Sequence, residues 1–362
     1  MNESDAETES LADDGRETEM ATRHRRERRV TMREVAKLAN VSVGTVSRVI
    51  NKKSSVQAEI KSRVQKAMDS LGYVPDAVAQ SMRSQATMAV GCMVSNVSNP
   101  LFASAVSAAE QVFHRSGYTM ILTNSQDSAI REKEILSLFS RRRLDGLICT
   151  VSNESDRELT SRLQSPDMPV VLLERVVDCP VDSVSTDHHG GALQAFNYLH
   201  ALGHRRIGLI TVTEAALPGR DRVKAYREVH RMAGIPYDPT LVATHGFSAE
   251  YGYRTGYEML TSENPPTALV AGANQMVGVL KAVRVLGLQI PRDLSLISFG
   301  DTDLAELFTP PLTVVRWGTH QVGATAAEIL ISRLTRTARK GPLKLVLPAE
   351  LMLRGSCGPA PK

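Results

Sequence analysis

This 362-residue chain has few cysteines, no long apolar run and no catalytic motif. Each of these absences argues against a class of protein. The four cysteines lie far apart, with no CxxC pair or Cys/His cluster, which argues against structural zinc and indicates a reducing compartment. No stretch reaches the roughly eighteen apolar residues of a membrane span. The acidic N-terminus lacks the apolar core of a secretion signal, so we expect a soluble cytoplasmic protein with no membrane partner.

Motifs for hydrolysis and nucleotide binding are also missing. The sequence contains no Walker P-loop, no HExxH, no GxSxG and no G-x-G. The pair His188-His189 could ligate a metal, but it has no neighbouring partner, and a polar loop is the alternative. We therefore expect no enzyme activity, no cofactor and no metal.

Charge is distributed unevenly at the N-terminus. Residues 1–20 hold eight acidic residues against one arginine, whereas residues 23–29 hold five arginines. With almost nothing apolar to bury, residues 1–29 are predicted to form a disordered tail, acidic and then basic. Two interpretations of the basic run remain open, contact with DNA phosphates or charge balance for the acidic segment.

Residues 31–51 are predicted to form two short helices around a tight turn. Thr31 and Glu34 fit a capping box at the first helix, and Ser42 can cap the second. Apolar residues recur at helical spacing on both: Val35, Leu38, Ala39, Val46, Val49 and Ile50. This is typical of a helix-turn-helix, in which the second helix enters the DNA major groove. An ordinary helical hairpin has the same periodicity.

A third helix follows the basic connection 52–55. Its apolar stripe consists of Ile60, Val64, Ala67, Met68 and Leu71. Gly72 is placed to end it as a C′ residue. Residues 30–74 are therefore predicted to form one small DNA-binding domain whose core is marginal for its size.

Residues 75–86 are predicted to form a short hinge helix or linker. Pro75 stops the third helix and Asp76 can cap a new one, which is too short to be stable alone. Met82 could insert as an apolar wedge into the minor groove, and Arg83 could read groove width or phosphate. The alternative is a plain interdomain linker with an incidental methionine.

The N-terminal motifs resemble those of the lactose-repressor/galactose-repressor (LacI/GalR) family of bacterial transcription regulators. They are Val35-Ala36, Val41-Ser42, residues 45–51 (TVSRVIN) and residues 72–75 (GYVP). The similarity extends from about residue 30 to 354. It implies that Val43, Gly44 and Arg48 read bases and that Met82, where the family usually has Leu, intercalates. The predicted DNA-binding residues are Thr31, Ser42, Val43, Gly44, Thr45, Ser47, Arg48, Asn51, Lys61, Tyr73, Ala79, Met82 and Arg83.

Several positions depart from that family pattern. Gly44 offers no side chain, so base readout is expected to rest on Val43, Thr45 and Arg48. Gln57 and Ile60 replace the usual Ser and Thr, which affects a helix cap and a phosphate contact, and Asp76 replaces Asn.

From residue 88 onward, short apolar runs alternate with helical patterns. Strands are expected at 90–94, 119–123, 146–150, 170–173, 207–211, 268–271 and 294–299. Helices are expected between them, for example at 102–115, 193–202, 222–233 and 276–286. Such alternation predicts parallel sheets covered on both faces, and the length exceeds one comfortable core. The fold class is thus a small all-α helix-turn-helix domain plus hinge, followed by an α/β core of two doubly wound subdomains.

The resemblance implies that the core, residues 87–354, looks like a periplasmic sugar-binding protein. Its lobes would exchange chain near residues 186, 316 and 342. The N-subdomain would comprise 87–186 and 316–341, and the C-subdomain 187–315 and 342–354, leaving a tail at 355–362. No heptads follow, so a tetramerising coiled coil is not expected.

A ligand in such a fold lies between the lobes, at the carboxyl ends of strands. The candidate effector-binding residues are Leu101, Phe102, Asn124, Arg175, Asp187, Arg222, Phe247, Asn274 and Asp301. Arg222 matches the family's pocket arginine and suits hydroxyl or carboxylate groups, and Phe247 could stack on a sugar face. Each residue alone is also explained as a loop or helix-cap residue.

Two expected pocket side chains are absent. The family usually has Asn-Asp where this chain has Ala273-Asn274, and Asp where it has Gly300. Three interpretations remain open: the effector binds differently, is unusual, or is absent.

We predict a dimeric transcription regulator, a repressor, that binds a near-palindromic operator and a sugar, sugar acid or related metabolite. The effector would change the relative orientation of the lobes and thereby whether the hinge helices of the dimer can pair. Release of DNA on effector binding (induction) and tighter DNA binding (corepression) are equally compatible with the sequence. Two alternatives are a solute-binding protein, which calls for a signal peptide and no helix-turn-helix, and an enzyme fused to a DNA-binding module, which calls for a catalytic constellation.

Overall fold

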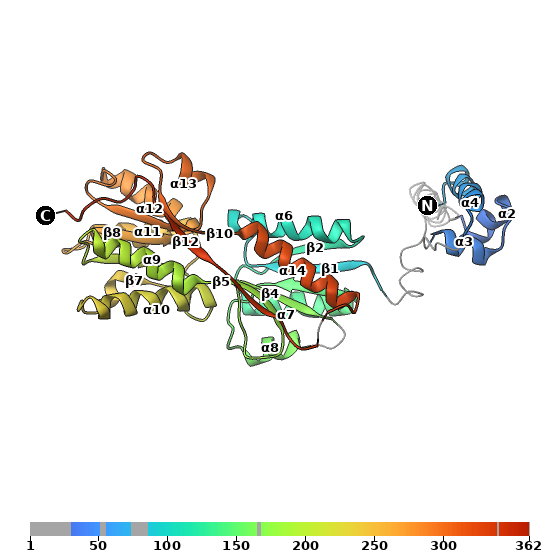
Figure 1. The fold of residues 1–362 in the computed structure, drawn as a ribbon, viewed down its shortest axis with the longest axis horizontal. Coiled ribbons are helices and arrows are strands. Elements are labelled where there is room, and N and C mark those ends of the chain that lie inside the picture. Colours follow the sequence, from blue (N-terminus) through green and yellow to red (C-terminus); the bar gives the residue numbers. More distant parts are fainter. Residues whose placement is uncertain (1–29, 51–55, 74–85, 165–167, 339, 362) are drawn as a thin grey trace, which may run out of the picture. The chain divides into compact units, whose positions relative to one another are not determined.

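A computed structural model describes residues 30–50, 56–73, 86–164, 168–338 and 340–361 (Figure 1). The chain divides into two compact units, Met1–Gln85 and Ala86–Lys362. The predicted tail 1–29 and nearly all of the predicted hinge lie outside the described residues. So do four predicted DNA-binding residues: Asn51, Ala79, Met82 and Arg83.

The first unit contains the three predicted helices, α2 (Met32–Leu38), α3 (Val43–Ile50) and α4 (Ala58–Leu71). The capping box is confirmed, since Glu34 N donates to Thr31 Oγ1 (3.4 Å) and Thr31 N donates to Glu34 Oε2 (2.7 Å). Ser42 Oγ accepts from Thr45 N at 3.1 Å and caps α3. Gly72 ends α4 with φ +64°, as predicted, and Gln57 starts α4 without a side-chain cap.

The three helices bury one small apolar core. Its buried members are Val35, Ala36, Ala39, Val46, Val64, Ala67 and Met68. The prediction that Leu38 belongs to this face is wrong, because its side chain is 54% exposed. At 3.6 residues per turn, the buried arc runs through Val35, Ala39 and Ala36, and Leu38 lies roughly 100° from its centre.

In the second unit, the N-terminal lobe is built on a parallel six-stranded sheet in the order β11-β5-β4-β3-β1-β2. Its strands are β1 (Ala89–Val94), β2 (Thr119–Asn124), β3 (Gly146–Cys149), β4 (Val170–Leu173), β5 (Asp182–Thr186) and β11 (Lys344–Leu347). Helices α6 (Pro100–Arg115) and α14 (Thr319–Leu334) cover one face, and α7 (Ala129–Arg141) and α8 (Arg157–Leu163) the other.

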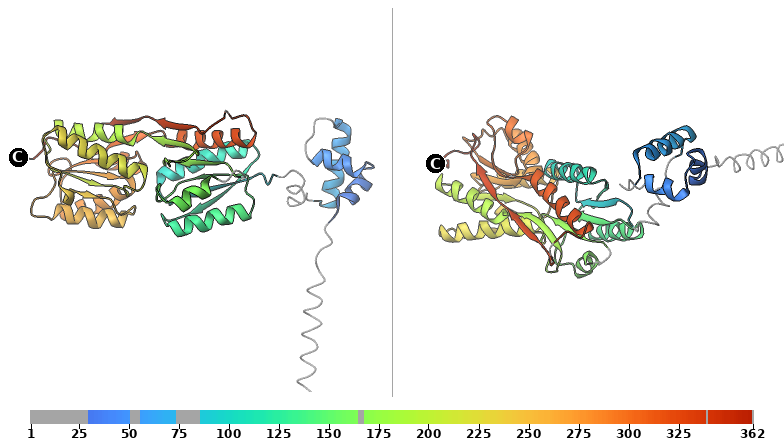
Figure 2. Two further views of the ribbon diagram at one scale, coloured as in Figure 1. Left: turned by 90° about the horizontal axis from the view of Figure 1, so that it is seen from below. Right: turned by 45° about the vertical axis from the view of Figure 1, so that its right-hand side comes forward.

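The C-terminal lobe repeats this arrangement with the order β12-β10-β9-β8-β6-β7. Its strands are β6 (Ile207–Ile210), β7 (Val242–Ala243), β8 (Ala268–Gly272), β9 (Ser295–Phe299), β10 (Thr313–Trp317) and β12 (Ala349–Met352), of which β12 is antiparallel. Its helices are α9 (His188–Ala201), α10 (Leu217–Met232), the 3-10 turn η1 (Pro239–Leu241), α11 (Ala249–Leu260), α12 (Ala273–Leu286) and α13 (Asp303–Leu307). Figure 2 shows helices on both faces of each sheet.

Three chain crossings join the lobes. They follow β5 at Asp187, β10 at Gly318 and β11 at Pro348. The predicted third crossing near residue 342 is wrong, because Lys344–Leu347 pairs with β5 of the N-terminal lobe. This edge strand is half-exposed and lacks the continuous apolar run that identifies a buried strand.

The last residues pack on the C-terminal lobe and extend it beyond the predicted end at residue 354. Ser356 is fully buried and donates to Leu296 O at 2.6 Å. Gly358 N donates to Ser295 Oγ at 3.1 Å. Ala360 N donates to Leu202 O at 2.9 Å.

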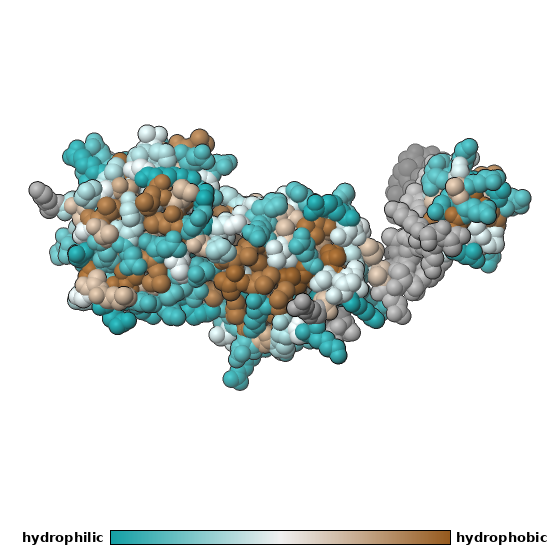
Figure 3. All heavy atoms as spheres, viewed as in Figure 1, coloured by the Kyte–Doolittle hydropathy of each residue, from teal (hydrophilic) through white to brown (hydrophobic). Residues whose placement is uncertain are grey.

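Hydrophobic side chains gather on the face that carries α14 and β11 (Figure 3). Within β11, Val346 is largely exposed. Among the described residues, no helix combines the length and the apolar character that crossing a bilayer requires.

Candidate functional site

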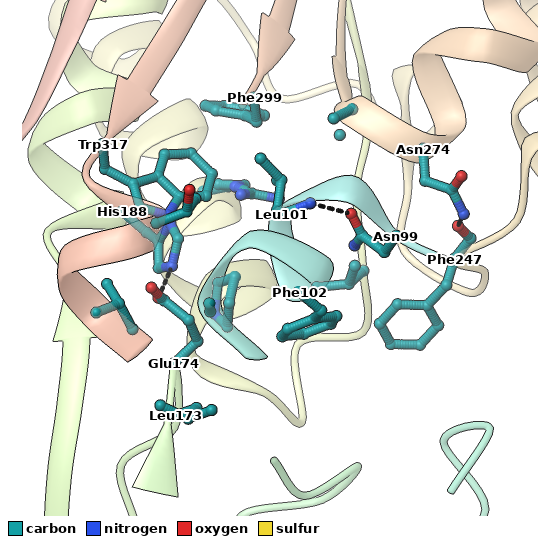
Figure 4. A pocket seen from close by; sticks show the side chains of 18 of the residues that line it. Asn99, Leu101, Phe102, Leu173, Glu174, His188, Phe247, Asn274, Phe299 and Trp317 are labelled. Atoms are coloured by element: carbon teal, nitrogen blue, oxygen red, sulfur yellow. Dashed lines mark hydrogen bonds and ion pairs between the residues drawn. The ribbon is translucent and has the colours of Figure 1, made fainter. Parts of the chain in front are cut away.

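The second unit contains a cavity of about 90 Å3 between its two lobes (Figure 4). It opens at the carboxyl ends of β4, β8 and β9, where parallel sheets place their ligand sites. Its lining residues are Asn99, Leu101, Phe102, Ala105, Leu173, Glu174, Arg175, His188, Val212, Pro218, Arg222, Phe247, Gly272, Ala273, Asn274, Gln275, Phe299, Trp317, Thr319 and Val322.

Most of the predicted effector residues meet in this cavity. Those that line it are Leu101, Phe102, Arg175, Arg222, Phe247 and Asn274. The other three have structural partners instead. Asn124 Oδ1 accepts from Val97 N at 3.0 Å, and Asp187 Oδ1 accepts from Gly190 N at 2.8 Å to cap α9. Asp301 is held by Arg354, whose two Nη atoms each donate to one carboxylate oxygen at 2.8 Å.

Arg222 is buried in α10 with few partners. Its side chain is 5% exposed, and within the described ranges its one hydrogen bond runs from Nη1 to Thr211 Oγ1 at a long 3.3 Å. Its Cζ atom lies 4.2 Å from the centre of the Phe299 ring, within cation–π range. Nε has no hydrogen-bond partner among the residues that the structure describes. Burial lowers the pKa of Arg222 to about 10, so the guanidinium remains charged at neutral pH.

Arg175 is the second cation on the cavity wall. It is buried, its Nε donates to Val151 O at 2.6 Å, and its Nη1 donates to Glu174 O at 2.8 Å. These backbone acceptors hold the side chain in place without neutralising its charge. The cavity wall therefore carries two positive charges, of which Arg175 is held firmly by backbone acceptors and Arg222 is not.

Glu174 is a buried carboxylate that its neighbours already satisfy. It accepts hydrogen bonds from Thr186 N (3.2 Å) and Thr186 Oγ1 (2.8 Å). His188 Nε2 lies 2.6 Å from its Oε2. Burial by itself raises the pKa of Glu174, but its interactions with His188 and Thr186 hold that pKa below its ordinary value. Glu174 is therefore ionised and joins β5 to the start of α9.

Aromatic rings make up much of the remaining wall. Phe102, Phe247, Phe299 and Trp317 line the cavity, and all four are labelled in Figure 4. Trp317 stands edge-on to His188, with ring centres 5.2 Å apart and planes at 86°. Both residues lie beside chain crossings, so the cavity wall includes the segments that connect the lobes.

The wall beside Gly300 is apolar. Gly300 has φ +106°, a conformation that favours glycine. A Cβ atom at Gly300 would lie 2.6 Å from Leu101 Cδ1, so Leu101 fills the space that a side chain there would need. Ala273 contributes only a methyl group, and the Asn274 and Gln275 amides donate to backbone carbonyls of Phe247 (2.7 Å) and Gly246 (2.8 Å).

In the first unit, α3 presents the predicted base-reading surface. Val43, Gly44 and Arg48 are exposed, while Ser47, Lys61 and Tyr73 are half-buried. The hydroxyls of Ser42 and Thr45 lie 2.9 Å apart, and the backbone N and Oγ1 of Thr31 donate to Glu34 Oε2. A Cβ atom at Gly44 would make ordinary contacts with Ser42 Oγ (3.6 Å) and Arg48 Nη2 (3.9 Å), so the gap at Gly44 is open surface beside Arg48.

Two sequence families match the two units. Residues 31–76 match "Bacterial regulatory proteins, lacI family", and residues 196–357 match "Periplasmic binding protein-like domain". The chain is 32% identical over 330 residues to the ribose operon repressor of Escherichia coli (strain K12), covering 90% of this chain and 99% of that protein.

The chain belongs to the lacI family of bacterial regulatory proteins. Among solved structures, it resembles the transcriptional regulator CelR–cellobiose complex (TM-score 0.68, 30% identity, 91% of this chain and 100% of that one). It also resembles the lac repressor dimer bound to operator and the anti-inducer ONPF (TM-score 0.77, 25% identity, 91% and 99%). The resemblance and the fold class inferred from the sequence are confirmed.

This lacI-family chain is a DNA-binding transcription regulator with an effector-binding core, and not an enzyme. Both alternatives, the solute-binding protein and the fused enzyme, are wrong on the same evidence. His188 and His189 open α9 and pair with Glu174 and with Glu228 (3.1 Å). In the described part of the chain, no three His, Cys, Asp or Glu residues form a group that could hold a metal ion.

The cavity also contains residues that the sequence did not identify as ligand-binding. His188, Trp317 and Thr319 lie at chain crossings, and Phe299 ends β9. The strand-end rule could have found Phe299. The crossing residues became identifiable only once the pairing of the strands was known.

Proposed function

We propose that this regulator is a homodimeric repressor whose operator affinity is set by a small molecule bound in the cavity between the lobes. The observation that carries the proposal is the position of His188, Trp317 and Thr319, which line the cavity and adjoin two of the three crossings. A ligand that contacts both lobes and their connections has different affinities for different lobe orientations. Such a difference is what couples an effector site to a distant DNA site.

The effector is expected to be a sugar, a sugar acid or a related metabolite. A ribose operon repressor and a cellobiose complex are among the proteins that this chain resembles. The proposed contacts are the cavity-lining members of the predicted set: Leu101, Phe102, Arg175, Arg222, Phe247 and Asn274. The roles proposed for Asn124, Asp187 and Asp301 are to support the cavity from outside.

A second copy of the chain is the proposed partner of the second unit. β2 is an edge strand, and it exposes Ile121 (42%) and Leu122 (39%). An edge with unpaired backbone groups and apolar side chains favours association. In the C-terminal lobe, Leu280, Leu304 and Phe308 line a groove beside the strongly exposed Leu307. A lac repressor structure similar to this chain is a dimer.

The DNA contacts are proposed to come from Val43, Thr45 and Arg48 on α3, with Thr31, Ser42, Ser47, Lys61 and Tyr73 nearer the phosphates. Gly44 is proposed to admit the DNA closely. A dimer would place two copies of α3 in successive major grooves. Because its target is chromosomal DNA, we place the regulator in the bacterial cytoplasm.

The test uses the full-length chain and duplexes that it selects from a random DNA pool. We expect sedimentation of a dimer and preferential binding to a near-palindromic site. One member of a panel of ribose, cellobiose, gluconate, benzoate and phenylacetate should change operator affinity at least about tenfold, a typical coupling. Absence of sequence preference, or of any effector response, would contradict the proposal.

A further inference from the structure

The polar atoms of the cavity are unevenly divided between donors and acceptors. Arg175 and Arg222 can only donate hydrogen bonds. Several acceptors of the lining are occupied, whereas Asn274 and Gln275 are bonded through their amide nitrogens and keep their side-chain oxygens for a ligand. Glu174 already accepts three hydrogen bonds, Asn99 Oδ1 accepts from Leu101 N at 3.1 Å, and Thr319 Oγ1 is bonded to Ser104 Oγ at 3.1 Å.

A polyol is a poor match for such a wall. Each hydroxyl group both donates and accepts, so a buried sugar needs free acceptors as well as donors. Among the described residues that line the cavity, those of the C-terminal lobe include no carboxylate: position 300 is glycine, and Asp301 is bound to Arg354 outside the lining. A carboxylate ligand accepts only, and it therefore matches an excess of donors.

Arg222 identifies where the ligand's charge would lie. Its Nε is an unpartnered donor on a side chain that is 95% buried, since 5% is exposed. The acidic groups whose charges reach it are Glu174 and Asp221, and no hydrogen bond joins either to Arg222 among the described residues. A buried, underbonded guanidinium is costly unless a partner arrives, and a planar carboxylate fits its donor geometry.

The rest of the cavity suits an apolar body. Leu101 fills the space beside Gly300, and Phe102, Phe247 and Trp317 present rings to the interior (Figure 4). Aromatic rings pack well against a flat ligand, and removing it from water stabilises the complex.

Given the effector-controlled function proposed above, we propose that the effector is a small carboxylate with an apolar, preferably aromatic, body. Its carboxylate is bound by Arg222, with Arg175 adding positive charge. Its body lies among Phe102, Phe247 and Trp317. The cavity thereby selects against neutral polyols.

The experiment measures ligand binding to the full-length chain through the fluorescence of Trp317, the single tryptophan, and through thermal shift. The probes are benzoate, phenylacetate, the neutral isostere benzamide, and ribose. The variants are Arg222→Met, which keeps side-chain volume without charge, and Arg222→Lys, which keeps charge without the planar fork. Arg231→Met, at an exposed position of the same helix α10, is the matched control. Circular dichroism verifies that each variant is folded.

We expect benzoate or phenylacetate to bind at least about tenfold more tightly than benzamide, as a charge-assisted hydrogen bond predicts. Arg222→Met should abolish that preference, Arg222→Lys should retain part of it, and Arg231→Met should leave it intact. Tight binding of ribose without binding of the carboxylates overturns this inference but leaves the proposed function standing. Binding of no probe also overturns it, and the operator assay then decides separately whether the proposed function holds.

Discussion

Leu101 of the N-terminal lobe fills the space beside Gly300 of the C-terminal lobe: a Cβ atom at Gly300 would lie 2.6 Å from Leu101 Cδ1. Gly300 also has φ +106°, outside the range that other residues adopt readily. Gly300→Ala is therefore expected to lower the free energy of unfolding by about 1–3 kcal/mol. Gly287→Ala is the matched control, because its φ is also positive (+67°) but nothing lies within 4 Å of its Cβ position. Equal losses for both variants in urea unfolding would contradict the contact with Leu101.

Asp127 provides a test of pH dependence. Burial, partly offset by the charge of Arg175, raises the pKa of Asp127 from 3.8 to about 6. A carboxyl whose pKa is raised by folding costs stability as the pH rises from 3.8 to about 6, and the full cost persists above that. Asp127→Asn should therefore raise the free energy of unfolding at pH 7 by up to about 3 kcal/mol, and by nothing at pH 3.5. Asparagine tolerates the φ of +53° at this position.

The measurement for Asp127 is urea unfolding of wild type and variant from pH 3.5 to pH 7.5. If the free energies of unfolding of wild type and variant differ by the same amount at every pH, the pKa of the Asp127 carboxyl is not raised by folding. A difference that grows as the pH falls would contradict the sign of the shift.

Arg48 is expected to carry much of the sequence preference, because Gly44 beside it has no side chain. Arg48→Ala should reduce the preference for operator over random DNA by about 1–3 kcal/mol if the Arg48 guanidinium makes a bidentate hydrogen-bonded contact with a base. Arg33→Ala, at an exposed position of α2, is the control for loss of positive charge alone. A competition gel shift that shows the same selectivity for both variants would refute a base-reading role for Arg48.

The edge strand β2 tests the proposed dimer. Leu122→Lys places a charge on the exposed edge and should weaken dimerisation at least about tenfold, because charged residues on an edge strand oppose association. Ile130→Lys is the control, since Ile130 is 72% exposed and belongs to α7, outside the strand itself. Sedimentation equilibrium that gives equal dimer stability for both variants would exclude β2 from the interface.

The DNA-binding helices could be predicted because local chemistry determines them. Thr31, Glu34, Ser42 and Gly72 act within a few residues of their own positions, so sequence spacing was enough. Strand β5 was missed for the opposite reason. Its residues Asp182, Ser183, Ser185 and Thr186 are polar, yet all are buried. Their partners come from distant residues, such as Arg333 for Asp182 (2.8 Å) and Glu174 for Thr186.

The residues of the candidate site also divide into those that local sequence predicts and those that depend on distant parts of the chain. Arg175 and Asn274 were predicted because they follow strands, and the carboxyl ends of parallel strands meet at one edge. Asp301 also follows a strand but is bound to Arg354, a residue near the end of the chain. His188 and Trp317 line the cavity because they lie next to chain crossings. The positions of these crossings depend on the order of the strands and not on any local sequence pattern.

The central claim is that one ligand in the cavity between the lobes controls operator binding. The most direct test titrates benzoate or phenylacetate into the full-length chain with labelled operator, recording Trp317 emission and DNA anisotropy on the same sample. Both signals should change with one midpoint, and both responses should disappear in Arg222→Met, which should still bind operator without ligand. An operator response that persists in Arg222→Met, or that occurs with no change in Trp317 emission, would contradict the central claim.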